Sequence, residues 1–220
     1  MSFSAEAALY SILRLRMIET QLRERGITDE RVLAAMTRVP RHEFTPEAFR
    51  HQAYSDYPSP IGEGQTISQP YMVALMLQAL ALRPEDKVLE VGTGSGYVTA
   101  LLAELTAQVV SMERHSVLAD EARAVLARLG YRNVDVIAGD GTAGFPARAP
   151  YDAIVVSAAA TEVPHALIAQ LSEGGRVISP VGPPESQQLQ LIQMLNGEPQ
   201  TSLRELCRFV PLLPGMGRRS

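Results

Sequence analysis

The run from Lys87 to Tyr97, KVLEVGTGSGY, has the residue types and spacing of a site that holds a small ligand against the backbone. Its first half is a short apolar stretch typical of a buried strand, and a helix-like stretch, Val98 to Leu105, follows the glycines. A strand that turns tightly into a helix through glycines lets a ligand approach the main chain, and it directs the helix N-terminus at that ligand. We expect an acid and three glycines of this loop to contact a cofactor: Glu90, Gly92, Gly94 and Gly96.

The spacing of these glycines separates two kinds of cofactor. The dinucleotide fingerprint, G-x-G-x-x-G/A, needs a small residue at position 97, where this chain has Tyr97. The form G-x-G-x-G, with an acid two residues before it, resembles instead the first motif of S-adenosylmethionine-dependent methyltransferases. An ordinary glycine turn in an α/β protein is the alternative, because short glycine motifs also occur without a ligand.

Two carboxylates that follow later strands extend this prediction. Glu113 ends the apolar stretch that begins at Gln108, about 20 residues after the glycine loop, where an acid commonly binds the ribose hydroxyls of a nucleoside. Asp140 follows the stretch over 134–138, and its carboxylate can accept a hydrogen bond from an adenine amino group. Helix capping by Glu113 and an ordinary Asp-Gly turn are the alternatives. Because three neighbouring strand ends would meet one ligand, we favour cofactor binding by four residues: Glu113, Arg114, Asp140 and Gly141.

The elements that must position these residues alternate between strands and helices. We predict strands over 87–92, 108–113, 134–138, 152–157 and 175–181. Helices are predicted near 96–106, 115–129 and 164–171. This alternation predicts a parallel, doubly wound α/β sheet, in which ligands bind beyond the carboxyl ends of the strands. That rule selects the loops after residues 91, 112, 138 and 156.

The N-terminal part of the chain precedes this regular pattern. Two helices near 5–25 and 29–37 should open the chain, the second capped by Thr28 or Asp29. A proline- and glycine-rich stretch over 40–70 follows. Its aromatic and apolar residues predict an ordered, packed segment, because long irregular stretches within a domain are usually either functional or disordered.

A very apolar helix over about 70–82 follows this stretch, and Pro70 suits its first turn. The C-terminal part is predicted to form two strands, Leu189 to Leu195 and Leu203 to Val210. Asn196-Gly197 separates them, and this dipeptide is a strong signal for a tight hairpin turn. We therefore expect a hairpin beside the sheet.

Composition excludes several classes of function. The net charge of the 220 residues is −4, so no overall basic field favours nucleic acid. The stretch over 5–13 is too short to span a bilayer and lacks the pattern of a signal peptide. Cys207 is the only cysteine, which rules out an intrachain disulfide and a cysteine-based zinc site and fits a cytoplasmic location. The histidines have no metal-ligand spacing, so we expect no metal: His42, His51, His115 and His165.

A second motif, AYSDYPSPIGEGQTISQPY over residues 53–71, is more specific than the glycine loop. It closely resembles the protein-L-isoaspartate (D-aspartate) O-methyltransferases. The matching residues are Ala53-Tyr54, Asp56, Pro60-Ile61-Gly62 and Gly64 to Tyr71. The resemblance extends over roughly residues 17–213, and its further matches include Arg25-Gly26-Ile27, Val39-Pro40-Arg41-His42, Glu113-Arg114, Gly139-Asp140-Gly141 and Arg208 to Leu212.

The resemblance implies methyl transfer from S-adenosylmethionine to the α-carboxylate of L-isoaspartyl, and also D-aspartyl, residues in damaged proteins and peptides. The methyl ester then closes to a succinimide, and hydrolysis of that ring returns some normal aspartate. A seven-stranded, Rossmann-like sheet in which the last two strands exchange their usual order is also implied. The position of Ser68 is treated in this family as the active-site residue. The matching pocket residues are Gln65, Thr66, Ile67, Ser68 and Tyr71 on the cofactor side, and Ile61, Gly62, Ser68 and Val210 on the substrate side.

This chemistry needs few catalytic groups. A carboxylate has a reference pKa of about 4, so it is ionised at neutral pH and needs no general base. What remains is in-line alignment of the reacting atoms and exclusion of water. Ser68 would donate a hydrogen bond that positions the substrate carboxylate, although it could instead cap the helix that begins near Pro70. Ser111 stands where an apolar residue is expected, and we predict that it changes packing only.

We expect one methyltransferase domain over residues 1–220. Its parts are N-terminal helices with a substrate-side segment (1–70), a cofactor-binding core (71–182), and C-terminal strands with a tail (183–220). The expected partners are isoaspartyl-containing proteins and peptides, and we expect a monomer with no nucleic-acid or membrane partner. Two alternatives stay open: an enzyme dedicated to aspartate in one specific peptide, and a cofactor-binding module without turnover.

Overall fold

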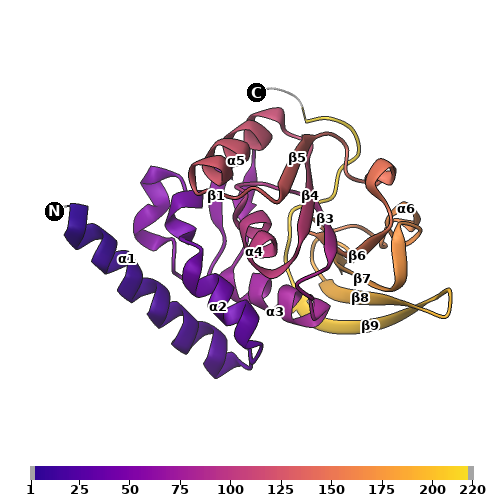
Figure 1. Cartoon of the computed structure of the whole chain (residues 1–220), viewed down its shortest axis with the longest axis horizontal. Helices are drawn as coiled ribbons and strands as arrows, with labels where there is room; N and C mark the ends of the chain where they lie inside the picture. Colours follow the sequence, from indigo (N-terminus) through magenta and orange to yellow (C-terminus); the bar gives the residue numbers. More distant parts are fainter. Residues whose placement is uncertain (1–2, 218–220) are drawn as a thin grey trace.

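One seven-stranded sheet organises the protein, and this computed structural model describes residues 3–217 (Figure 1). In spatial order the strands are β5 (Val134–Ala138), β4 (Gln108–Glu113), β3 (Lys87–Val91), β6 (Tyr151–Val156), β7 (Leu171–Val181), β8 (Gln187–Leu195) and β9 (Glu198–Cys207). The first five pair in parallel, whereas β8 is antiparallel to both of its neighbours. The predicted mostly parallel, Rossmann-like sheet is therefore confirmed. The last two strands lie in sequence order, with β9 at the edge, as the resemblance implies.

The predicted parallel strands agree with the structure within one residue at each end for β3 to β6. Strand β7 was predicted to begin at 175 but begins at Leu171, which already pairs with Tyr151. The preceding helix, α6 (His165–Ile168), is correspondingly shorter than the prediction over 164–171. Residues 171–174, which the local pattern assigned to a helix and its loop, therefore belong to β7, because this strand pairs with β6 from Leu171 onward.

The C-terminal hairpin was predicted correctly, but its second strand starts earlier than expected. Asn196 and Gly197 have φ values of +54° and +77°, as a two-residue turn between antiparallel strands requires. Pairing resumes at once between Leu195 and Glu198. Strand β9 ends at Cys207, so the following residues leave the sheet and are free to reach the neighbouring loops.

The helices are α1 (Phe3–Met17), α2 (Glu30–Arg38), α3 (Pro70–Leu80), α4 (Tyr97–Leu105), α5 (Ser116–Arg128) and α6. Asp29 caps α2, because its carboxylate accepts hydrogen bonds from the N–H groups of Arg31 and Val32. The first predicted helix, over 5–25, is less regular than expected: α1 is followed by a π-helical turn, Ile18–Leu22, and a 3-10 turn.

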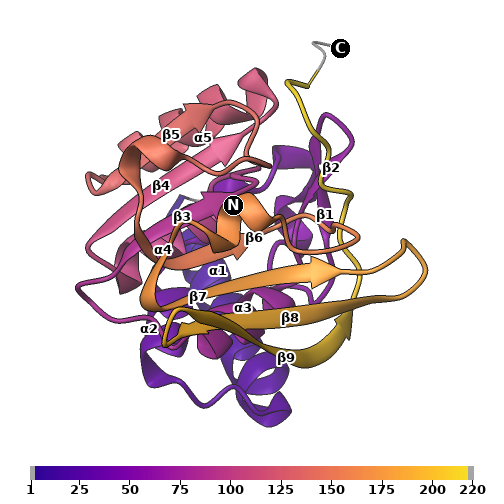
Figure 2. The same ribbon diagram turned by 90° about the vertical axis from the view of Figure 1, so that its right-hand side faces the viewer.

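Helices cover the two faces of the sheet unequally. Helices α2 to α5 pack on the face that carries Val88 and Val109, within the larger apolar core. The opposite face, with Leu89 and Val110, is covered by the short α6 and by loop and tail residues. Figure 2 shows the sheet from this thinly covered side. Loops and the C-terminal tail therefore cover more of this face of the sheet than helices do.

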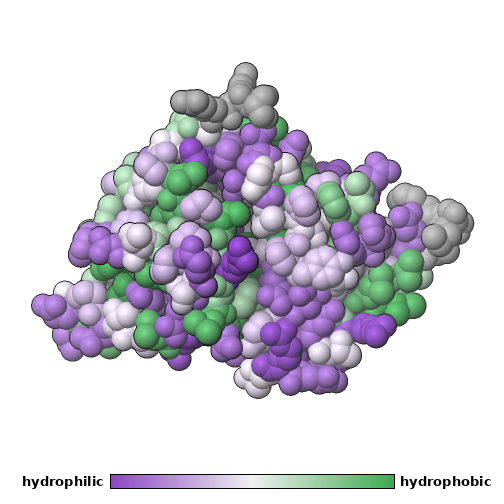
Figure 3. Space-filling model, turned by 180° about the vertical axis from the view of Figure 1, so that it is seen from behind, coloured by the Kyte–Doolittle hydropathy of each residue, from purple (hydrophilic) through white to green (hydrophobic). Residues whose placement is uncertain are grey.

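Helix α1 joins the core mainly at its C-terminal end. Met17 is fully buried, whereas Leu9, Ile12 and Leu15 are 42%, 63% and 54% exposed. Figure 3 shows one face of the molecule, with hydrophilic residues over much of the surface and hydrophobic ones in separate clusters between them. Within residues 3–217, no helix combines the length and the apolar character that crossing a membrane requires.

The stretch over 40–70 is ordered and packed, as predicted. It contains two 3-10 helices, Arg41–Phe44 and Glu47–Gln52, and a hairpin of β1 (Ser59–Gly62) and β2 (Gln65–Ile67). Several of its apolar side chains are buried in the larger core: Phe44, Ala53, Tyr54, Ile61 and Ile67. The hairpin was not predicted, because strands of three and four residues interrupted by proline carry little periodic signal.

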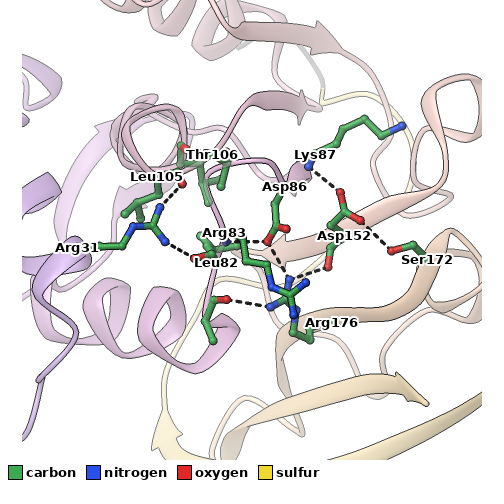
Figure 4. Close-up of polar contacts among 12 residues, drawn as sticks. Arg31, Leu82, Arg83, Asp86, Lys87, Leu105, Thr106, Asp152, Ser172 and Arg176 are labelled. Carbon is green, nitrogen blue, oxygen red and sulfur yellow. Dashed lines mark hydrogen bonds and ion pairs between the residues drawn. The ribbon is translucent and has the colours of Figure 1, made fainter. Parts of the chain in front are cut away.

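A buried polar cluster ties together the amino ends of the parallel strands, opposite the edge where ligands bind (Figure 4). The Arg176 guanidinium donates to the Asp86 carboxylate at 2.8 Å and to the carbonyl oxygen of Ala81 at 2.9 Å. The Asp152 carboxylate accepts the N–H of Lys87 at 2.9 Å and the hydroxyl of Ser172 at 3.0 Å. These contacts join β3, β6 and β7 far from the candidate site.

Replacing Arg176 by methionine is expected to destabilise the protein by about 3 kcal/mol, because it leaves the Asp86 carboxylate buried without its cation. The side chains of this pair are only 10% and 4% exposed. Chemical denaturation would measure the loss. Arg38→Met is the matched control, since Arg38 pairs with Glu104 but is 54% exposed, and its loss should be far smaller. Equal losses would contradict the burial argument.

Candidate active site

A pocket opens beyond the carboxyl ends of β3, β4 and β6, the edge that the strand-end rule selects. Its walls come from the glycine loop, from β2 and the residue after it, from the residues that follow the strands, and from 210–213 of the tail. The predicted site residues that line it are Gln65, Thr66, Ile67, Ser68, Gly92, Gly94, Glu113, Arg114, Gly141 and Val210. Segments far apart in the sequence thus form one cavity.

The glycine loop brings bare backbone to the pocket wall. Gly92 and Gly94 have φ values of +97° and +53°, which residues with side chains rarely adopt. A Cβ atom on Gly94 would lie 3.2 Å from Cδ1 of Ile61, and one on Gly92 would lie 3.4 Å from Cβ of Ser157. The N–H of Gly92 donates to the carbonyl of Met112 at 2.8 Å, which joins the loop to β4. The loop is therefore both close-packed and open to a ligand.

Glu113 links β4 to the glycine loop through its side chain. One carboxylate oxygen accepts the N–H of Gly94 and the other accepts the N–H of His115, both at 2.9 Å. The side chain is almost fully buried but lines the pocket. The capping alternative holds in part, because His115 is the cap residue of α5. Each carboxylate oxygen can accept a second hydrogen bond, so Glu113 can still receive hydroxyl donors from a ligand.

Ser68 stands between two cavities. A second pocket adjoins the first, and four residues line both: Thr66, Ser68, Ser157 and Val210. Its other walls are Pro58, Gln69, Met72 and the segment 206–209. Gln69, not Ser68, is the cap residue of α3, and the first-turn N–H of Tyr71 donates to the carboxylate of Asp56 at 3.2 Å. The alternative that Ser68 caps α3 is therefore wrong, and its hydroxyl is available at the boundary of the cavities.

Glu90 does not reach the pocket, which corrects its prediction as a cofactor contact. Its side chain is fully buried, and one carboxyl oxygen accepts the hydroxyls of Thr99 at 2.5 Å and Ser111 at 2.6 Å. The Ser111 hydroxyl also lies 2.5 Å from that of Thr93, a pocket residue. Ser111 therefore does more than change packing, contrary to prediction. It connects the buried acid to the glycine loop. Burial raises the pKa of Glu90 to about 8.

Glu90→Gln is expected to alter how stability depends on pH. Burial raises the pKa of Glu90 from 4.5 to about 8. Between these two pH values Glu90 stays protonated in the folded protein, whereas it loses its proton in the unfolded chain. Wild-type stability should then fall as pH rises from about 5 to 8, and the variant should lack this contribution. Urea unfolding of both proteins at several pH values would measure the difference.

The free energy of unfolding of Glu90→Gln minus that of the wild type should rise across this window and level off above it. Glu121→Gln, at an exposed position on α5, is the control, and its difference should stay flat. A constant difference for Glu90→Gln between about pH 5 and 9 would mean that Glu90 is ionised throughout in the folded protein.

The Asp140 carboxylate accepts hydrogen bonds from other residues of the chain. One carboxylate oxygen accepts the N–H of Gly215 at 2.6 Å, and the other accepts the N–H and hydroxyl of Thr142 at 2.9 and 2.7 Å. Arg114 holds the same part of the tail, donating to the carbonyl of Gly215 at 3.2 Å and accepting the N–H of Gly217 at 2.9 Å. Asp140 is not among the residues that line the pocket, and its predicted contact with a ligand stays a prediction.

Four other predicted residues lie outside the pocket. The ring of Tyr71 lies under the guanidinium of Arg25, 3.5 Å from its Cζ atom. Gly96 is the cap residue of α4, and a Cβ atom there would lie 3.2 Å from Cβ of Ala122, so this glycine permits helix packing. Ile61 and Gly62 belong to β1 and line a neighbouring groove beside α5 instead. Both residues belong to the unpredicted hairpin of β1 and β2.

Several pocket residues were missed by the sequence prediction. Ser157 follows β6 directly, so the strand-end rule, which selected the loop after 156, was a sufficient signal for it. The tail residues 211–213 also line the pocket, and although Pro211 and Leu212 lie in the stretch that resembles the family, none of the three was predicted as a site residue. They reach the pocket through pairing with Ala159, whose N–H donates to Val210 and whose carbonyl accepts the N–H of Leu212, both at 2.7 Å. Such long-range pairing cannot be read from a local pattern.

A family model and the curated relatives place the chain in one family. The family model for protein-L-isoaspartate(D-aspartate) O-methyltransferase (PCMT) matches residues 14–217. A protein-L-isoaspartate O-methyltransferase of Methanoculleus marisnigri is 56% identical over 205 residues, which are 93% of each chain. One of Koribacter versatilis is 52% identical over 217 residues, 99% of this chain and 98% of that protein.

Solved structures agree with this similarity. A protein-L-isoaspartate O-methyltransferase superposes with a TM-score of 0.82 at 30% identity, covering 93% of this chain and 67% of the other. A structure from Plasmodium falciparum, solved in complex with S-adenosyl-L-homocysteine, has a TM-score of 0.79 at 29% identity and covers 91% and 98% of the two chains.

Proposed function

The chain belongs to the protein-L-isoaspartate(D-aspartate) O-methyltransferase family, and we propose that it binds S-adenosylmethionine and an isoaspartyl peptide on the two sides of Ser68. It is an enzyme that uses S-adenosylmethionine to methylate the α-carboxylate of L-isoaspartyl residues in damaged proteins and peptides. One observation carries the assignment of sides: Ser68 lines both adjoining pockets.

The first pocket suits an adenosine-containing cofactor. Glu113 offers carboxylate oxygens at the end of β4, where ribose hydroxyls are commonly bound. Gly92 and Gly94 leave bare backbone on the adjacent wall, and Met112 and Leu212 add apolar surface. When bound, S-adenosylmethionine supplies an activated methyl group. Because Gly92 lies near Ser157, which also lines the second pocket, we place the reacting end of the cofactor at this boundary.

The second pocket suits the peptide substrate. Within residues 3–217, its lining includes a single charged side chain, Arg208. A guanidinium complements a carboxylate-bearing ligand in shape and charge. Met72, Leu206 and Phe209 supply apolar walls beside the place where the carboxylate would bind. Cys207 and Val210 complete this side near the end of β9, where the chain leaves the sheet.

Catalysis by these residues consists of positioning. The substrate carboxylate is already ionised near neutral pH, so no side chain has to remove a proton. Ser68 donates a hydrogen bond from its hydroxyl to one carboxylate oxygen and so directs the other toward the first pocket. Correct placement of two reactants contributes several kcal/mol to such a reaction. The enzyme then releases a methyl ester that closes to a succinimide without further help.

Several finer properties follow as proposals. We infer that D-aspartyl residues are also accepted, and that the enzyme acts in the cytoplasm as a monomer, without nucleic acid. A net charge of −4 and a single cysteine agree with this inference. The three parts over 1–70, 71–182 and 183–220 would serve the substrate side, the cofactor and the sheet edge, respectively.

The proposed function is tested with two short peptides of one sequence, one containing L-isoaspartate and the other normal aspartate. The purified protein is incubated with each peptide and methyl-labelled S-adenosylmethionine. We expect base-labile methyl ester on the isoaspartyl peptide alone. Equal labelling of both peptides would contradict the selectivity. No transfer to either, with cofactor binding intact, would favour a dedicated peptide enzyme or a binding module.

A further inference from the structure

Arg41 is a buried arginine whose hydrogen bonds go to the main chain. It lies on the 3-10 helix Arg41–Phe44 and is 1% exposed. Within residues 3–217 it forms no salt bridge, and its Nη1 atom has no hydrogen-bond partner. A charge in this position is costly unless hydrogen bonds compensate its lost hydration. The contacts that it does make therefore indicate the role of this arginine.

Those contacts are with two backbone carbonyls of the stretch over 53–71 and with one aromatic ring beside the glycine loop. The Nε atom donates to the carbonyl oxygen of Ala53 at 2.7 Å, and Nη2 donates to that of Ser68 at 2.8 Å. The guanidinium also lies over the ring of Tyr97, with its Cζ atom 4.8 Å from the ring centroid. Tyr97 begins α4 directly after the glycine loop and lines the first pocket.

One rigid, planar group thus spans the two halves of the site. The segment between β2 and α3 carries Ser68, and the segment after β3 carries the glycine loop. Arg41 contacts the backbone of the first and the first helical side chain of the second. The distance between Ser68 and the cofactor side of the pocket is therefore set in part by this guanidinium.

We propose that Arg41 is a positioning residue for methyl transfer, which acts by holding the Ser68 backbone in register with the glycine loop. This inference rests on the proposed function of Ser68. A lysine cannot replace Arg41, because a single ammonium group on a flexible stem does not reproduce a planar fork that reaches two carbonyls. The rate of methyl transfer should then fall even where the fold and the cofactor site survive.

Arg41→Lys tests the proposal. We expect kcat to fall about tenfold or more, because small misplacements of reacting groups have large kinetic costs, while the Kd of S-adenosyl-L-homocysteine changes less than about twofold. Arg31→Lys is the matched control. Arg31 also donates to two backbone carbonyls, those of Leu82 and Leu105, but at the opposite edge of the sheet (Figure 4), so its kcat should stay unchanged.

A double-mutant cycle with Ser68→Ala separates positioning from general structural damage. If Arg41 acts through Ser68, Arg41→Lys should lower kcat about tenfold in the presence of Ser68 and less than about twofold in the Ser68→Ala background. Equal losses in both backgrounds, or no loss in the first, would overturn the proposal. Full activity of Ser68→Ala alone would refute the role of Ser68 itself, and with it the premise of the inference.

Folding is checked independently, by thermal unfolding of each variant with and without bound S-adenosyl-L-homocysteine. Kinetic constants are referred to the concentration of folded sites, measured by titration with that ligand. If Arg41→Lys does not fold, Arg41→Gln enters the same cycle at saturating cofactor, which stabilises the folded state by mass action. The glutamine keeps one amide donor at this position, and the same pattern of losses decides the question.

Discussion

Ser68→Ala should lower kcat about a hundredfold and leave cofactor binding nearly unchanged. The Ser68 hydroxyl lies at the boundary of the two pockets, and it does not cap α3. Its loss removes a hydrogen-bond donor from the position where the acceptor carboxylate must be aligned, and a misplacement of reacting groups by about 1 Å can cost about a hundredfold in rate. Steady-state kinetics with an isoaspartyl peptide would measure kcat, and calorimetry would measure the Kd of S-adenosyl-L-homocysteine.

Ser157→Ala provides the comparison for this variant. Ser157 also lines both pockets, but it follows β6 instead of β2. Because no role in aligning the carboxylate is assigned to it, its kcat should fall only severalfold. A folded Ser68→Ala enzyme with wild-type kcat would refute the catalytic assignment. Equal losses of kcat in the two variants would mean that Ser68 has no special role and acts only as one of several polar residues that line the pockets.

Glu113→Ala should weaken cofactor binding about a hundredfold and affect saturated turnover much less. Hydrogen bonds to a charged group contribute about 1.5–3 kcal/mol each, and Glu113 is the carboxylate that lines the first pocket at the end of β4. The side chain also accepts the N–H groups of Gly94 and His115. Its removal therefore loosens the glycine loop as well, which adds to the loss of affinity.

The Kd of S-adenosylmethionine is measured by calorimetry, and kcat is measured at cofactor concentrations above the raised Kd. Glu121→Ala is the control, because Glu121 is exposed on α5 and lines only the neighbouring groove. Unchanged affinity in a folded Glu113→Ala protein would refute ribose binding by Glu113. A fall in kcat as large as the rise in Kd would place this acid nearer to the reacting groups.

The sheet was predictable because its signals are local. Each of the strands β3 to β6 is a short apolar run bounded by turn residues, and the run itself suffices to predict it within one residue. The hairpin of β1 and β2 escaped prediction, because its strands are too short to show a period. Strand β7 was predicted only from residue 175, because Leu171 takes its extended conformation from pairing with Tyr151, a distant partner.

The site residues were predictable where only one kind of residue meets a local requirement, such as glycine at a positive φ value. Gly92 and Gly94 adopt positive φ values at the pocket wall, and Glu113 lines it from the next strand. Prediction was less successful where a side chain of the same type can serve elsewhere. Glu90 turned out to be fully buried, and Asp140 accepts the N–H of Gly215 from the tail. Nothing in their neighbouring residues distinguishes these acids from Glu113.

By itself, the amino-acid sequence determined the family, the mostly parallel sheet and the edge at which ligands bind, because motifs and strand periodicity are properties of short segments. Only the tertiary structure decided which carboxylates face the pocket, that Ser68 stands between two cavities, and that Arg41 holds the Ser68 backbone. Those properties depend on contacts between residues distant in sequence. The spacing of residues along the chain does not encode such contacts, and they arise only when the segments pack together.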